Sequence, residues 1–240
     1  MGGIAMYAAF VIAIPVAHSR TVVEEGVVVL AGATLLLITG MIDDRRGMRP
    51  LVKLLAQVGA ALLLILGGVQ ISMFSNDIVN ACLTVFWVVG ICNAMNLLDN
   101  MDGLSGGIAA IACASFAILA ALNGQIWVSV VAAVLFGSIL GFLWFNWNPA
   151  SIFMGDAGSG FTGFAIALLL VNSTRSPGFS PWTALILTAP FVSDATLTLV
   201  RRMLRGERWY DAHRSHAYQW LARRWRGHAR VTLLVIALDL

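Results

Sequence analysis

The chain has 240 residues, of which 59% are hydrophobic and only 11% are charged. Soluble proteins carry about 25% charged residues, so this composition excludes a soluble domain, a disordered or nucleic-acid-binding tail and a disulfide-stapled secreted fold. The mean hydropathy of +0.85, with the apolar residues in long runs, predicts a polytopic membrane protein, whereas the net charge of +3 says little by itself.

The apolar runs predict eight membrane spans and a C-terminal stub. In chain order they are Ile4–Ala17, Gly26–Ile42, Leu54–Phe74, Ile78–Leu98, Leu104–Leu122, Ile126–Phe145, Gly158–Val171 and Trp182–Val200, with the stub at Val231–Leu238. The first and seventh runs fall short of the roughly 17 residues that a spanning helix needs, but they are similarly apolar. The predicted fold class is therefore all-α, a single transmembrane helix bundle over residues 1–240.

The charges predict the orientation of these spans. With the N-terminus inside, the hydrophilic segments 43–53, 99–103, 146–157 and 201–230 lie on the cytoplasmic face. They carry thirteen of the 15 Lys and Arg residues, and only Arg20 and Arg175 lie outside. This partition obeys the positive-inside rule. Six aspartates converge with these bases at one face, which suggests a divalent cation and a phosphorylated substrate.

Asp43 and Asp44 close the second run as adjacent carboxylates. Two neighbouring carboxylates repel each other unless a cation or a base lies between them. The pair is either a polar helix end neutralised by Arg45 and Arg46, or part of a cation site.

The segment from Asn93 to Gly103 places polar residues three apart, so that each neighbours the next on a helix. Asn93 and Asn96 would lie within the membrane, where polar groups are costly and are usually satisfied or functional. Interhelical hydrogen bonding accounts for the asparagines, but it does not account for Asp99 and Asp102. An EF-hand is excluded because the downstream glutamate is absent.

The glycine-rich segment around Asp156 offers a second cation ligand. Residues 158–163 match the dinucleotide fingerprint G-x-G-x-x-G, but no strand precedes them, so the match is spurious. The glycines favour close helix packing, and a glycine-rich turn that leads into a helix also forms an anion site.

Two further features lie near the C-terminus. Asp194 is an ionisable residue within a span, which marks either a functional site or a structural pair with an arginine. The loop at 206–220 combines His213, Arg214 and His216, which suit a pyrophosphate better than zinc, since no third zinc ligand is near.

Together these motifs resemble the bacterial polyprenyl-phosphate N-acetylhexosamine-1-phosphate transferases of glycosyltransferase family 4. Met1 to Ile4 resembles the family's early glycine pair, and Asp43-Asp44 resembles its aspartate pair. Residues 93–103 are similar to its N-A-x-N-x-x-D-G-x-D-G segment, 153–159 to its F-M-G-D-x-G-S loop, and 213–219 to the histidine loop of the O-antigen type. Asn100 departs from the pattern, since many relatives have glycine there. The family's ten or eleven spans imply that one span before Met1 and most of one after Arg230 are missing.

The resemblance implies a Mg²⁺-dependent enzyme, with Mn²⁺ as the alternative ion. It would transfer N-acetylhexosamine-1-phosphate from a UDP-sugar to undecaprenyl phosphate, release UMP and so initiate O-antigen or another cell-envelope polysaccharide. The implied catalytic residues are Asp43, Asp44, Asp99 and Asp102, and the implied metal ligands are Asp156 and Asp44. The implied substrate-binding residues are Asn93, Asn96, Asp194, Arg201, Arg202, His213, Arg214 and His216.

The expected location is the bacterial inner membrane with the active site toward the cytoplasm, and a homodimer is one assembly to expect. No nucleic-acid partner is expected. The chemistry is either direct transfer or a covalent aspartyl-phosphate path. Alternatives are the phospho-MurNAc-pentapeptide translocase, which the histidine loop argues against, a polyprenyl-lipid or sugar transporter, and a non-catalytic scaffold.

Overall fold

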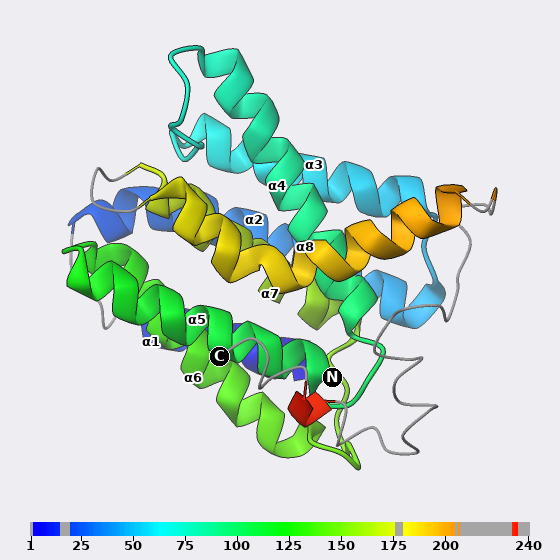
Figure 1. Cartoon of the computed structure of the whole chain (residues 1–240). Coiled ribbons are helices and arrows are strands. Elements are labelled where there is room, and N and C mark those ends of the chain that lie inside the picture. Colours follow the sequence, from blue (N-terminus) through cyan, green and yellow to red (C-terminus); the bar gives the residue numbers. More distant parts are fainter. Residues whose placement is uncertain (1, 15–19, 176–179, 205, 207–231, 235–240) are drawn as a thin grey trace.

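The computed structural model describes residues 2–14, 20–175, 180–204, 206 and 232–234. As predicted, the described part is all-helical and forms a bundle (Figure 1). Its principal helices are α1 (Gly2–Ala13), α2 (Arg20–Arg46), α3 (Pro50–Leu66), α4 (Asp77–Leu98), α5 (Leu104–Leu122), α6 (Ile126–Asn146), α7 (Gly155–Ser173) and α8 (Pro181–Leu204). Four helical stretches are long and apolar enough to cross a membrane: Gly26–Arg46 of α2, α4, α5 and α6. The chain is therefore a multi-pass membrane protein, and the total of eight spans stays a prediction.

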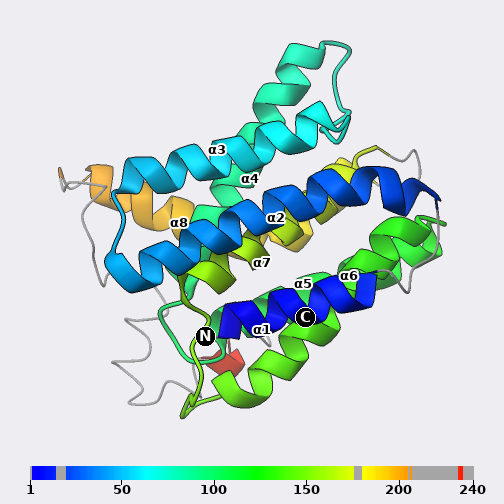
Figure 2. The ribbon, with the colours of Figure 1, turned by 180° about the vertical axis from the view of Figure 1, so that it is seen from behind.

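Helix α7 is the centre of the bundle. It packs against α1, α2, α4, α5, α6 and α8, and every residue from Phe161 to Ser173 is buried. Seen from both sides, α7 lies between a group formed by α2, α3, α4 and α8 and a group formed by α1, α5 and α6 (Figures 1 and 2). The seventh apolar run is short and rich in small residues because it faces protein rather than lipid.

Glycines allow α1 and α2 to approach the start of α7 closely. A Cβ atom on Gly3 would lie 2.3 Å from the backbone nitrogen of Gly158, and one on Gly40 would lie 2.4 Å from the Cα atom of Ala157. Both distances are shorter than any real Cβ contact, so only glycine fits. The first turn of α7 is therefore wedged between two other helices.

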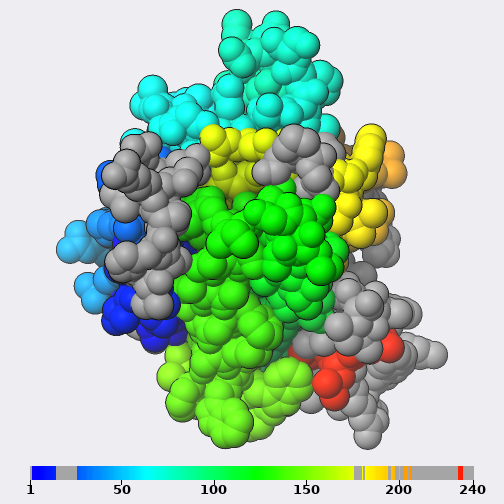
Figure 3. Space-filling view, turned by 90° about the vertical axis from the view of Figure 1, so that its left-hand side faces the viewer, coloured from blue at the N-terminus to red at the C-terminus, as the bar shows by residue number. Residues whose placement is uncertain are grey.

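The third predicted span, Leu54–Phe74, is wrong at its C-terminal end, because α3 stops at Leu66. Gly68 adopts a φ of +76°, and the N–H groups of Gly68 and Val69 donate to the carbonyls of Ile65 and Leu64. This is the Schellman arrangement, in which a left-handed glycine ends a helix. Residues 67–76 form a connection to α4, and this α3–α4 end stands out from the rest of the molecule (Figure 3).

The hydrophilic segment 43–53 is mostly helical rather than a loop. Helix α2 continues to Arg46, and α3 begins at Pro50 with proline in its first turn, where its missing N–H costs nothing. Only residues 47–49 are non-helical, and Gly47 takes a φ of +68° in that turn. Asp43 and Asp44 are thus held on a helix and close to the first turns of α3.

Candidate active site

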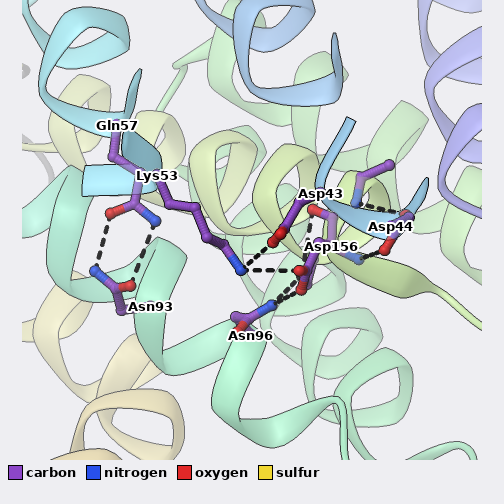
Figure 4. A network of polar contacts seen from close by, with 9 residues as sticks. Asp43, Asp44, Lys53, Gln57, Asn93, Asn96 and Asp156 are labelled. Atoms are coloured by element: carbon purple, nitrogen blue, oxygen red, sulfur yellow. Dashed lines mark hydrogen bonds and ion pairs between the residues drawn. The ribbon is translucent and has the colours of Figure 1, made fainter. Parts of the chain in front are cut away.

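Asp43 and Asp44 point in different directions because consecutive helical residues do not share a face. The Asp43 carboxylate lies 2.5 Å from the ammonium nitrogen of Lys53, one turn into α3. The Asp43 side chain is largely buried and that of Lys53 about a third exposed. The two adjacent aspartates therefore serve different contacts, as Figure 4 shows.

The Asp156 carboxylate is shared between two helices. Its Oδ2 atom lies 2.8 Å from the Lys53 ammonium on α3, and its Oδ1 atom accepts a hydrogen bond from the Asn96 side chain on α4. The Asn96 amide also donates to the Ser159 hydroxyl at 3.1 Å. Lys53 thus bridges the carboxylates of Asp43 and Asp156, and Asn96 holds the far side of Asp156 (Figure 4).

Asp44 caps the N-terminus of α7 from a different helix. Its two oxygens accept from the backbone N–H groups of Asp156 at 2.8 Å and Ala157 at 3.3 Å. A Cβ on Gly155, which has a φ of +69°, would lie 2.7 Å from the Asp44 carboxylate. Where the sequence predicts an anion site, the structure places the Asp44 carboxylate, and an anion site for a ligand stays a prediction.

Asp99 follows the last residue of α4 and is the titratable group whose burial has the clearest consequence. Burial raises its pKa to about 7, and the negative charges of Asp156 and Asp44 act in the same direction. Hydrogen bonds from the Ser105 hydroxyl, at 2.9 Å, and from the Gly155 backbone oppose that rise. A carboxyl with a pKa near neutrality can accept or release a proton at working pH.

Asp102 holds the loop that leads to Asp156. Its carboxylate accepts from the Asn148 side chain at 2.9 Å and from the Ala150 N–H at 3.1 Å. Beside it, Asn146 accepts from the Gly103 N–H and donates to the Ile152 carbonyl, both at 2.9 Å. The α4–α5 and α6–α7 connections are thereby joined next to the carboxylate cluster, and the described hydrogen bonds of the Asp102 side chain go to that loop.

The other predicted site residues are placed less completely. Asn93 pairs with Gln57 rather than with Asp156. Asp194, Arg201 and Arg202 lie on α8 and only their backbone is described, and His213, Arg214 and His216 lie outside the described residues.

Four residues of the site are not among those that the sequence predicts: Lys53, Gln57, Ser105 and Ser159. A signal existed for the first two, since Lys53 and Gln57 stand one helical turn apart in an otherwise apolar run. Polar groups at that spacing in a membrane helix indicate a shared polar face.

The carboxylates have the donor chemistry that Mg²⁺ prefers. The part of the chain that the structure describes contains no group of three or more His, Cys, Asp or Glu that could hold a metal alone. Mg²⁺, however, is commonly held by one or two carboxylates together with substrate phosphates. Asp43 and Asp156 already share one cation, the Lys53 ammonium, so the pair fits an ion whose remaining ligands come from substrate and water.

Comparison with known proteins identifies the family of this chain. Residues 27–174 match the model of Glycosyl transferase family 4. A probable undecaprenyl-phosphate N-acetylglucosaminyl 1-phosphate transferase of Bacillus subtilis is 32% identical over 99% of this chain and 69% of its own length. A decaprenyl-phosphate N-acetylglucosaminephosphotransferase of Mycobacterium leprae is 31% identical over 98% of this chain and 69% of its own length. A phospho-N-acetylmuramoyl-pentapeptide-transferase of Limosilactobacillus fermentum is 35% identical over 67% of this chain and 53% of its own length. The chain therefore belongs to glycosyl transferase family 4, among the polyprenyl-phosphate N-acetylhexosamine-1-phosphate transferases.

Proposed function

We propose that this enzyme transfers N-acetylhexosamine-1-phosphate from a UDP-N-acetylhexosamine to undecaprenyl phosphate at the cytoplasmic face of the bacterial inner membrane. An oxygen of the lipid phosphate forms a bond to the sugar-bearing phosphorus of the donor. The bond from that phosphorus to the bridging oxygen breaks, and UMP leaves with the electron pair. The product is a lipid-linked sugar pyrophosphate that starts a cell-envelope polysaccharide.

The observation that carries this proposal is the shared cation between Asp43 and Asp156 at the start of α7. Phosphoryl transfer depends mainly on positioning and on charge stabilisation. An ammonium has three N–H donors, and the described partners of Lys53 account for two, which leaves one for a phosphate oxygen. The exposed Arg45, Arg46 and Arg49 lie at the same end of the bundle and favour an anionic substrate.

Each aspartate of the cluster has a separate role in the proposed transfer. Asp43 and Asp156 would hold Mg²⁺, which when bound neutralises charge on the donor pyrophosphate. Asp99, with its pKa near neutrality, accepts the last proton of the lipid phosphate, whose second pKa is about 6. Asp44 acts by fixing the first turn of α7, on which Asp156 stands.

A groove between α4 and α8 supports a lipid acceptor. Its volume is about 440 Å³, and its lining is mostly apolar: Trp87, Leu185, Ala189, Val192, Ser193, Thr196 and Leu197. Isoprenoid units are apolar chains that such a lining accommodates. We expect Trp87→Ala to raise the KM for undecaprenyl phosphate and to leave the KM for the UDP-sugar unchanged.

The test is UMP release from membranes that contain the enzyme, undecaprenyl phosphate and Mg²⁺, with UDP-GlcNAc and other UDP-N-acetylhexosamines in parallel. We expect Asp156→Asn to abolish turnover. The matched control is Asp77→Asn, the same substitution at the N-terminal end of α4, far from Asn96. It should leave turnover intact. Undiminished turnover in Asp156→Asn overturns the assignment of this carboxylate.

The same panel separates the alternatives. The similarity to the Limosilactobacillus pentapeptide transferase justifies including UDP-MurNAc-pentapeptide, and transfer from that donor alone would replace the proposed substrate. Movement of labelled polyprenyl lipid without UMP would indicate a transporter.

A further inference from the structure

A second polar contact joins α3 and α4, one turn away from the carboxylate cluster. The Gln57 and Asn93 side chains form a reciprocal amide pair: Asn93 donates to the Gln57 carbonyl oxygen at 2.9 Å, and Gln57 donates to the Asn93 oxygen at 3.4 Å. The Asn93 amide also donates to the Val89 carbonyl of its own helix at 2.9 Å. That bond fixes which end of the Asn93 amide faces Gln57.

The pair and the cluster form two rungs between the same helices. On α3, Lys53 lies four residues before Gln57; on α4, Asn96 lies three residues after Asn93. Residues at these spacings share a helix face. The first rung is Gln57 with Asn93, and the second is Lys53, Asp156 and Asn96, in which each oxygen of Asp156 is held from one helix (Figure 4).

The contacts of Lys53 and Asn96 with Asp156 require α3 and α4 to keep a fixed rotation and height relative to each other. A lysine has a flexible stem, and its donors rotate freely, so its reach is set by the helix that carries it. Among the described residues, Gln57–Asn93 is the only side-chain hydrogen bond between α3 and α4. Apolar contacts alone resist rotation or sliding of a membrane helix weakly, whereas an amide pair is directional. Gln57 is buried whereas Asn93 is exposed, so the hydrogen bonds between them are partly buried.

We propose that Gln57 and Asn93 are positioning residues, whose amide pair sets the rotation and height of α3 against α4 so that Lys53 and Asn96 meet the Asp156 carboxylate. Asn93 thus serves the reaction through its partner helix and not by contact with substrate. This inference rests on the proposed transferase function.

The test exchanges the two side chains. Gln57→Asn shortens one partner by a methylene, and Asn93→Gln lengthens the other, so each single variant breaks the reciprocal geometry. We expect each to lower the turnover of UMP release by about 10–100-fold, as loss of an outer-shell partner does, with the KM for the UDP-sugar little changed. The double variant Gln57→Asn/Asn93→Gln restores the combined length and should exceed both single variants. A double variant no better than the product of the two losses overturns the inference.

A second cycle asks whether the pair acts through Lys53. In a Lys53→Met background, Gln57→Asn should cost much less than it does in the wild type, because the group that it positions is gone. An undiminished loss would indicate general structural damage and contradict a positioning role. Gln70→Asn is the matched control, since it is the same substitution in the α3–α4 connection, away from the cluster, and it should leave turnover unchanged.

Thermal unfolding in detergent of the wild type, the two single variants at positions 57 and 93 and their double variant tests the amide pair independently of activity. Coupling between positions 57 and 93 is expected, and its absence overturns the pair itself. A wild type that releases no UMP from any donor refutes the proposed function and with it the positioning role, whereas an active wild type without rescue in the double variant refutes the inference alone.

Discussion

The cap that Asp44 provides to α7 gives a prediction that separates the two adjacent aspartates. Asp44→Ala removes the acceptors of two backbone N–H groups at the partly exposed start of α7. Loss of an N-cap costs about 0.5–2 kcal/mol, and two donors to one charged group place this case near about 2 kcal/mol. For a chain of this length that corresponds to a fall in Tm of about 4–8 °C. Asp43→Ala leaves Lys53 with Asp156 and should lower Tm by less.

The assay is thermal unfolding of the purified protein in detergent, paired with UMP release by the conservative variants. Asp44→Asn keeps one acceptor oxygen and the shape of the cap, so it should retain measurable turnover. Asp43→Asn removes a charge that faces the reaction and should not. An Asp44→Ala protein as stable as the wild type would refute the capping role. Equal loss of turnover in both Asn variants would show that Asp44 takes part in the chemistry directly.

Four further outcomes follow from named contacts. Because burial raises the pKa of Asp99 to about 7, the folded chain holds that proton more tightly than the unfolded chain. The unfolding free energy should therefore fall as pH rises from 3.8 to about 7. Ser105→Ala removes a hydrogen bond that lowers this pKa, so the acid limb of UMP release should move to higher pH; an unmoved limb assigns it to another group. Gly40→Ala places a Cβ 2.4 Å from the backbone of Ala157 and should cost about 1–3 kcal/mol in thermal unfolding, whereas an unchanged Tm would show that α2 and α7 can separate freely. Lys53→Met leaves two facing carboxylates without their shared cation, so it should tighten Mg²⁺ binding in calorimetry while it slows turnover; weaker binding would place the ion elsewhere.

The bundle and the location of the site follow from the sequence because both depend on where polar groups interrupt apolar runs. Asp43, Asp99 and Asp156 are far apart in the chain, yet each ends or begins an apolar run at the same predicted membrane face. Threading alternate spans through a bilayer brings such ends together. Asp43, Asp44 and Asp156 do come together in the structure, with Asp99 close enough for the charges of Asp44 and Asp156 to act on its pKa.

Details that depend on helix rotation and on partner choice were beyond the sequence. The residues around Lys53 do not predict that its side of α3 faces Asp156. The adjacent pair Asp43-Asp44 does not predict that Asp44 caps another helix. The end of α3 was misplaced for a related reason. Apolar residues continue beyond Gly68, and the left-handed turn there depends on backbone geometry rather than on hydropathy.

The burial of α7 on all sides has a consequence for how the protein is made. This helix begins with glycines, Asp156 and Ser159 and ends near Asn172, so by itself it partitions into lipid less readily than its neighbours. Yet α1, α2, α4, α5 and α6, which form most of its surroundings, all precede it during synthesis. When α7 leaves the ribosome, the earlier helices that surround it in the fold have already been made and can pack around it. The order of the helices along the chain thus lets a helix with polar ends enter the bilayer next to helices that are already there.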